Sequence, residues 1–205
     1  MKAGFRVGMR AALALALLVP ATAQAQFSDA YNFLKAVKDV DGQKVTDLVQ
    51  KPGSTVINSR DITTGATALH IVIARRDNGW LAFLLDKGAN PNLADNRGVT
   101  PLMEAVQSRF EDGVRTLISG GAQVDKANGS GETPLIRAVQ LRDIGLVRLL
   151  VANGANPDKR DTIAGMSARE YATRDGRTPG LVDALASAKS AGSAPKGAVQ
   201  GPVFR

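Results

Sequence analysis

The chain has 205 residues, enough for one or two domains, and carries 26 Lys and Arg against 19 Asp and Glu, a formal net charge of +7. Hydrophobic residues make up 44% of it, which allows a core and argues against disorder throughout. The absence of cysteine and the presence of a single histidine exclude disulfides, thiolate metal sites and catalytic pairs of imidazoles. Aromatic residues, at 4%, are too few for a nucleic-acid surface built on base stacking.

Residues 1–25 contain the three parts of a secretory signal peptide. A basic start is followed by an apolar run over residues 11–19 and by an A-x-A cleavage site that ends at Ala25. The apolar run is shorter than the roughly 20 residues that cross a bilayer, so we expect no stable membrane insertion after cleavage. We expect cleavage after Ala25 and export to the periplasm, or secretion.

Most of the positive charge lies outside the middle of the chain. Lys2, Arg6 and Arg10 belong to the predicted signal peptide, and the last basic residues follow the final acid, Asp183. A nucleic-acid-binding domain needs a basic face on its folded part, so we expect no nucleic-acid partner.

A 33-residue repeat occupies residues 62–160. The segment that begins at Gly65 recurs at Gly98 and again at Gly131, and the Gly-Ala pair at residue 88 recurs at the same interval. The recurring segments read Gly65-Ala-Thr-Ala-Leu-His70, Gly98-Val-Thr-Pro-Leu-Met103 and Gly131-Glu-Thr-Pro-Leu-Ile136.

Each repeat contains two helical patterns, with apolar residues at i, i+3 and i+4. In the first full repeat these are Leu69, Val72 and Ile73, followed by Leu81, Leu84 and Leu85. Helices this short, with one apolar stripe each, are unstable alone and are expected to stack.

The ends of these helices are also predicted. Threonines 67, 100 and 133 are expected N-caps, with Pro101 and Pro134 at the first helical position. Glycines 88, 121 and 154 are expected to end the second helix, before a projecting turn.

These motifs resemble the ankyrin repeat. The Thr-Pro-Leu-His-x-Ala signature appears as Thr100-Pro-Leu-Met-Glu-Ala, and the Leu-Leu-x-x-Gly-Ala-x-x-Asn portion as Leu84-Leu-Asp-Lys-Gly-Ala-Asn-Pro-Asn92. With its signal peptide, the chain is similar to secreted bacterial ankyrin-repeat proteins. The resemblance implies an all-α ankyrin-repeat solenoid of stacked helix-turn-helix pairs with projecting β-turn or hairpin loops.

Two degenerate repeats flank the full ones, as terminal caps with one face in water. Phe33, Ala36 and Val37 begin the double stripe of the first, and Ala168, Tyr171 and Ala172 begin that of the last. We therefore expect a repeat domain over 26–189 and a disordered tail over 190–205, where Gly, Pro and Ser dominate. The expected repeat bounds are about 28–61, 62–94, 95–127, 128–160 and 161–188.

Three sets of residues could carry chemistry. His70 lies where ankyrin-like repeats tie the turn to a neighbouring repeat by hydrogen bonds, so we expect a structural role and no metal site. Acids near the turns, such as Asp95 and Asp161, are expected to bond the turns, because repeats about 10 Å apart cannot share one ion. Arg76, Arg109 and Arg142 form a column at 33-residue spacing, read as a solvated ladder of charge or as an edge that steers an acidic partner.

We expect a non-catalytic, monomeric scaffold without cofactor or metal that binds another protein through its concave face. The alternative is a regulatory or protective subunit of a periplasmic enzyme; an enzyme in its own right is not expected. The partner-binding candidates are loop-tip residues and exposed residues of the first helix of each repeat. They are Thr63, Thr64, Arg75, Asn96, Arg97, Val99, Gln107, Ser108, Ser130, Glu132, Gln140, Leu141 and Thr162.

Overall fold

A computed structural model describes residues 21–186, with side-chain surroundings from residue 29 onward. Ten α-helices and one short 3-10 helix form in this part of the chain, and no strand does. Most of the predicted signal peptide, and the whole of the tail predicted at 190–205, lie outside the described residues.

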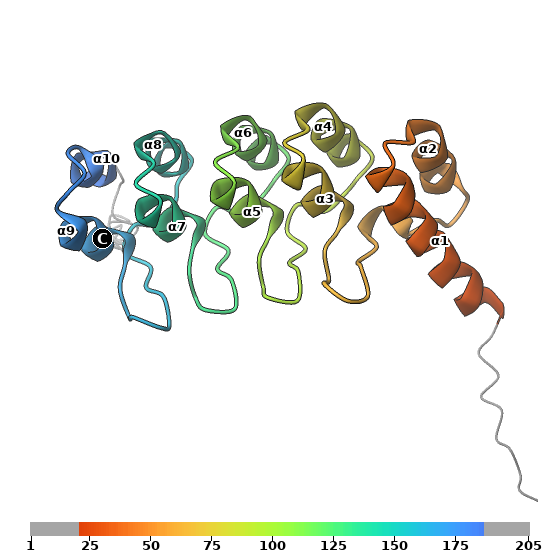
Figure 1. Cartoon of the computed structure of the whole chain (residues 1–205), viewed down its shortest axis with the longest axis horizontal. Coiled ribbons are helices and arrows are strands. Elements are labelled where there is room, and N and C mark those ends of the chain that lie inside the picture. The colour runs from red at the N-terminus through yellow and green to blue at the C-terminus, as the bar shows by residue number, and fades with distance from the viewer. Residues whose placement is uncertain (1–20, 187–205) are drawn as a thin grey trace, which may run out of the picture.

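The helices follow one another as five antiparallel pairs, which we number as repeats one to five. Their bounds are α1 (Ala21–Lys38), α2 (Gly42–Gln50), η1 (Val56–Asn58), α3 (Ala68–Ala74), α4 (Asn78–Asp86), α5 (Pro101–Gln107), α6 (Glu111–Ser119), α7 (Pro134–Gln140), α8 (Ile144–Ala152), α9 (Ala168–Asp175) and α10 (Leu181–Ala186). Figure 1 shows the odd-numbered helices in one row, the even-numbered helices in a second row, and loops projecting beyond the odd-numbered row. We call the first row the inner helices and the second row the outer helices.

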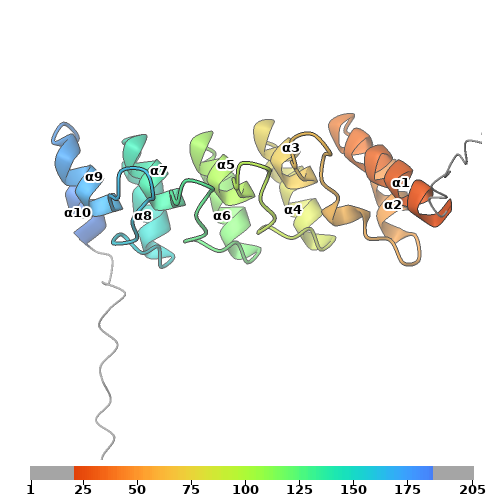
Figure 2. The ribbon, with the colours of Figure 1, turned by 90° about the horizontal axis from the view of Figure 1, so that it is seen from below.

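The core runs as one layer between the two rows. The predicted apolar stripes face it: Leu69, Val72 and Ile73 of α3 are each at most 1% exposed, and Leu81 and Leu84 of α4 are fully buried. Each inner helix packs on the next inner helix as well as on its own partner. Seen from below in Figure 2, the pairs stand in a single row, so each repeat contacts mainly its neighbours. The predicted ankyrin-like solenoid of five helix pairs is confirmed.

The predicted helix ends are also confirmed. Thr100 Oγ1 accepts a hydrogen bond from the Met103 N–H at 3.2 Å, and Pro101 occupies the first helical position of α5. After α6, Gly121 has a φ of 88°, in the left-handed region where glycine is favoured. The threonine and proline begin the inner helix, and the glycine after the outer helix leads the chain into the loop.

Four loops project from the inner row, and each is turned by one side-chain oxygen at its tip. Asp95 Oδ1 accepts the N–H groups of Arg97 at 2.8 Å and Val99 at 2.9 Å. Isolated antiparallel bridges, Arg60–Thr67 and Arg160–Ser167, join the two sides of the first and last loops. The loops are therefore hairpin-like without forming a sheet. None of the helices within 21–186 is long and apolar enough to span a bilayer.

Candidate protein-binding surface

The tips of the four loops are joined to one another by backbone hydrogen bonds. We define the tips as residues 61–65, 95–98, 128–131 and 161–165. The Asn96 N–H donates to the Thr64 carbonyl at 3.0 Å, and the same relation at 3.1 and 3.0 Å joins the second tip to the third and the third to the fourth. A Cβ added to Gly98, whose φ is 78°, would lie 2.5 Å from the Gly129 nitrogen. The tips therefore form one row whose close approach requires glycine.

A second row of hydrogen bonds lies where each outer helix passes into its loop. The side-chain oxygens of Asn58, Asn92 and Asp125 accept the N–H groups of the residues that open the following loop, at 2.7, 2.7 and 2.9 Å. Each acceptor belongs to one repeat and each donor to the next. Neighbouring repeats are thus fixed at both the base and the tip of their loops.

The arginine column forms a third set of ties between repeats. Arg76, Arg109 and Arg142 have φ values of 55°, 53° and 56°, and each guanidinium reaches the following repeat. Arg76 donates to the Ser108 carbonyl, Arg109 to the Leu141 carbonyl at 2.7 Å, and Arg142 to Asp175 at 2.8 Å. All three side chains remain exposed, so the column is the predicted solvated ladder of charge, and its guanidinium groups also tie each repeat to the next.

His70 has the predicted structural role. Its side chain is 7% exposed, its Nδ1 accepts the Thr67 N–H at 3.1 Å, and its protonated Nε2 donates to the Val99 carbonyl of the next repeat at 3.0 Å. Burial lowers the pKa of His70, because it disfavours the imidazolium form. His70 therefore joins the second repeat to the third as a neutral side chain.

The turn acids are held ionised by the loops. Burial alone would raise the pKa of Asp95, but the Val99 N–H and the Arg97 side chain and N–H outweigh it and lower the pKa. The pKa of Asp161 is lowered in the same way by the Tyr171 hydroxyl and by three backbone N–H groups, against the effect of burial. Among residues 21–186 no cluster of three or more His, Asp or Glu could hold a metal ion. The predicted turn-bonding role of these acids is confirmed.

Several of the predicted partner-binding residues meet in one hollow. A depression of about 520 Å³ between the first two tips and helices α3 and α5 is lined in part by Thr63, Thr64, Asn96 and Arg97. Its lining also includes Ile71, Ala74 and Glu104, which are not among the predicted partner-binding residues. Glu104 lies one repeat of 33 residues after Ile71, so the spacing that identified the apolar stripes could also have identified this column on the inner helices.

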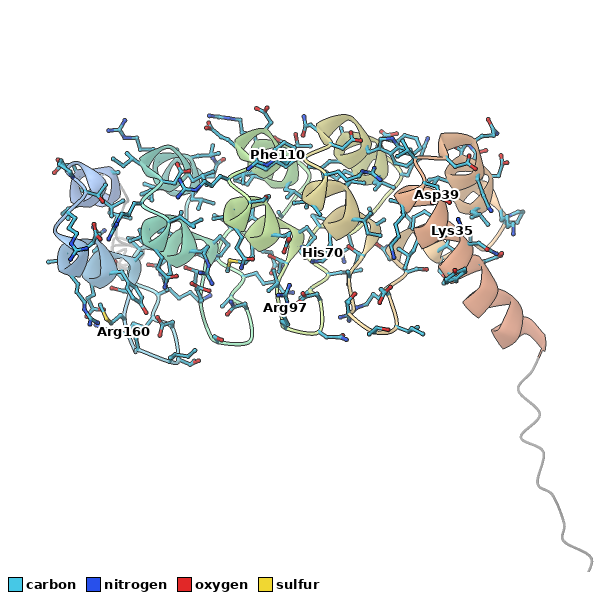
Figure 3. The ribbon with its side chains drawn as sticks, in the orientation of Figure 1. Lys35, Asp39, His70, Arg97, Phe110 and Arg160 are labelled. Carbon is cyan, nitrogen blue, oxygen red and sulfur yellow. The ribbon has the colours of Figure 1, made fainter. Side chains whose placement is uncertain are left out.

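We call the tips, together with the side of the inner helices that faces them, the inner face. It carries both signs of charge around the hollow. The Arg97 side chain is 73% exposed and lies 3.0 Å from the buried Asp95 carboxylate. Figure 3 shows Arg97 at the loops, below the inner helices. Lys38 and Glu104 line the same hollow. The arrangement offers polar and charged contacts on a hollowed surface.

The prediction is wrong for two of the partner-binding candidates. Val99 is 5% exposed and Glu132 is 7% exposed, so neither can reach a partner. Both follow the tip glycine, where the chain folds back under its own loop. The Val99 N–H and carbonyl are both bonded, and the Glu132 carboxylate binds Arg137 at 2.7 Å.

The other candidates differ in how freely they can bind. Arg75 donates to the Val37 carbonyl at 2.6 Å, and Ser108 bonds back to the Glu104 carbonyl at 2.9 Å. Leu141 is half-buried against the core, and Thr162 donates to the Ser130 carbonyl at 2.8 Å. The Gln140 side chain hydrogen-bonds the Tyr171 hydroxyl of the next repeat, and Gln107, on the preceding inner helix, is half-buried. Gln140 lines a smaller hollow of about 340 Å³ beside Tyr171 and Arg174.

Comparison with known proteins agrees with this architecture. The family of ankyrin repeats in three copies matches residues 33–128, and the single ankyrin repeat matches residues 130–162. Together these matches cover more than half of the sequence.

The chain belongs to the ankyrin-repeat family. It is similar to an ankyrin repeat protein of fowlpox virus (strain NVSL), with 43% identity over 51 residues, which are 25% of this chain and 15% of the viral protein. The chain thus spans a small part of that relative. Ankyrin repeats are in general non-catalytic scaffolds for protein–protein interaction.

Proposed function

We propose that this ankyrin-repeat protein is a bacterial periplasmic scaffold that binds one partner protein through its inner face, as a monomer. The hollow of about 520 Å³ carries the proposal, because it gathers side chains from two successive tips and from the inner helices α1, α3 and α5. Such a surface exists only when the repeats are stacked, so a partner that binds there recognises the folded repeat array.

Rigidity supports the proposal. Three kinds of tie join successive repeats: the backbone bonds at the tips, the Asn and Asp side chains at the loop bases, and the arginine column. A surface held in this way loses little conformational entropy when a partner binds. The four lining residues Thr63, Thr64, Asn96 and Arg97 are thus presented in a fixed arrangement.

Export rests on the sequence of the first 25 residues. Cleavage after Ala25 would leave residues 26–38 of α1, including the fully buried Phe33 and Val37. The first repeat therefore keeps its core contacts in the mature chain. Mass spectrometry of the exported fraction is expected to find an N-terminus at Gln26, and an intact Met1 in that fraction would contradict export with cleavage.

Affinity purification of the tagged mature chain from its own envelope fraction tests the binding surface. Arg97→Ala and Gln107→Ala are expected to reduce recovery of the partner while leaving the melting temperature within a few degrees of the parent. Arg148→Ala on α8 is the matched control, because it removes an exposed arginine from an outer helix. Full recovery with both inner-face variants would contradict the proposal.

A further inference from the structure

An apolar groove separates α1 from the first projecting loop. Its volume is about 390 Å³, and its apolar lining comes from Ala30, Tyr31 and Leu34 of α1 and Ile62 of the first tip. Figure 1 shows α1 inclined away from the loop that precedes α3. The groove shares Lys38 and Asp61 with the larger hollow, so the two are continuous on the inner face.

Two large apolar side chains that line this groove are mostly exposed. Ile62 is 91% exposed and Tyr31 is 68% exposed, whereas Leu34 beneath them is buried. The tip does not need Ile62, because Asp61 Oδ1 makes its turn with the N–H groups of Thr63 and Thr64. Exposed apolar pairs beside a buried floor are the kind of feature that anchors a protein–protein contact.

The polar rim of the groove is mainly cationic. Lys35, Lys38 and Arg60 line it, against one acid, Asp61. Lys38 lies 3.9 Å from Asp61, and Lys35 is paired with Asp39. Arg60 donates to the carbonyl oxygens of Gly65 and Ala94 and has no carboxylate partner among the described residues, so its charge is left uncompensated.

We propose that the groove binds a segment of the partner protein in which an apolar anchor is flanked by Asp or Glu. The anchor packs on Tyr31, Leu34 and Ile62, and the carboxylates face Lys38 and Arg60. This inference rests on the proposed function, since the groove opens onto the same inner face. The ends of the chain itself fit poorly, because the charged side chains of residues 1–20 and 187–205 are all basic and the rim repels them.

Peptides of defined charge test this specificity on the full mature chain. The probe is a short fluorescein-labelled peptide with a central Trp-Leu pair between two acidic flanks. One control replaces the acids with lysine, and the other replaces the Trp-Leu pair with glycine. Fluorescence anisotropy is expected to show that the acidic peptide binds at least about tenfold more tightly than either control. Its affinity is expected to fall as the salt concentration rises. Equal binding of the acidic and lysine peptides, or no measurable binding of the acidic one, would overturn the inference.

Matched variants locate the binding. Ile62→Ser is expected to weaken binding of the acidic peptide at least about tenfold, because Ile62 is the proposed apolar contact for the anchor of the peptide. Ile163→Ser is the control, because Ile163 is 80% exposed at the fourth tip, far from the groove. Lys38→Glu is compared with Lys44→Glu on α2, and only the former is expected to weaken binding. Equal effects of Ile62→Ser and Ile163→Ser would overturn the assignment.

Two further results separate the possibilities. Light scattering that shows a dimer lost on Ile62→Ser would make a second copy the occupant and overturn the proposed partner chemistry. If the envelope partner depends on Arg97 and Gln107 but not on Ile62, the groove assignment fails while the proposed function stands. If the peptide binds as expected but no partner depends on Arg97 or Gln107, the proposed function fails and the groove chemistry stands.

Discussion

The Arg109 guanidinium reaches from the third repeat to the fourth, where Nη2 donates to the Leu141 carbonyl oxygen at 2.7 Å. The backbone that directs it there is left-handed, with a φ of 53°, a conformation that costs a non-glycine residue about 1–2 kcal/mol. Arg76 and Arg142 repeat this arrangement one repeat earlier and one later. The ties thus offset a backbone cost that a glycine at the same position would avoid.

Two substitutions at Arg109 separate the tie from the backbone cost. Arg109→Ala is expected to lower the free energy of unfolding by about 1–3 kcal/mol, because it loses the inter-repeat bond and keeps the left-handed backbone. Arg109→Gly is expected to cost about 1 kcal/mol less than the alanine variant. Urea unfolding followed by circular dichroism measures both. Arg115→Ala, at an exposed site on α6, should change stability by less than about 0.5 kcal/mol. An alanine variant as stable as the Arg115 control would mean that the column contributes nothing.

Leu117 tests whether the stripe of an outer helix forms the core. It is fully buried in α6. Leu117→Ala is expected to lower the free energy of unfolding by about 2–5 kcal/mol, because it removes apolar contacts and leaves a cavity. A variant that melts at the temperature of the parent would show that this stripe does not form the hydrophobic core.

Gly98 tests the close approach of the loop tips. Gly98→Ala places a Cβ 2.5 Å from the Gly129 nitrogen, whereas a Cβ at Gly121, also at positive φ, meets nothing within 4 Å. Both variants pay the left-handed cost of about 1–2 kcal/mol, and Gly98→Ala is expected to lose more stability because the tip bond is also displaced. Thermal unfolding of the two variants compares them directly. Equal losses would indicate that the tips can separate without cost.

The pKa of His70 makes stability depend on pH. Because burial lowers it in the folded chain, the unfolded chain binds a proton first as the pH falls below about 6.5. The contribution of neutral His70 is therefore complete above that pH and is lost as the pH falls towards the folded pKa. Urea titrations at pH 7 and pH 5 are expected to show a loss of stability in the parent and a smaller loss in His70→Met. Methionine is chosen because Met103 occupies the same position one repeat later. Equal losses in the two proteins would contradict a buried neutral His70.

Periodicity was sufficient to predict the helices, the caps and the core. The positions of Leu69, Thr100 and Gly121 follow from residue types that recur where the physics of helix ends requires them. The buried Val99 could not be separated from an exposed tip residue, because its burial depends on how the loop folds back under itself. Its N–H is bonded to Asp95 and its carbonyl to His70, and both bonds exist only in the stacked structure.

The inter-repeat ties of the arginine column were not predicted for a related reason. Its spacing showed that Arg76, Arg109 and Arg142 are equivalent, but no residue pattern reveals a positive φ in a residue other than glycine. That backbone geometry directs the guanidinium to the next repeat, while the side chain stays exposed. The groove beside α1 was missed because it lies between a degenerate first repeat and a longer first tip, where the 33-residue register no longer applies.

Site-specific photo-crosslinking in cells tests the binding face most directly. A photoreactive residue at Gln107, on inner helix α5, is compared with one at Arg148, which is exposed on outer helix α8. Binding through the inner face predicts a discrete crosslinked partner from position 107 and none from position 148. A partner captured from position 148 but not from position 107 would contradict it.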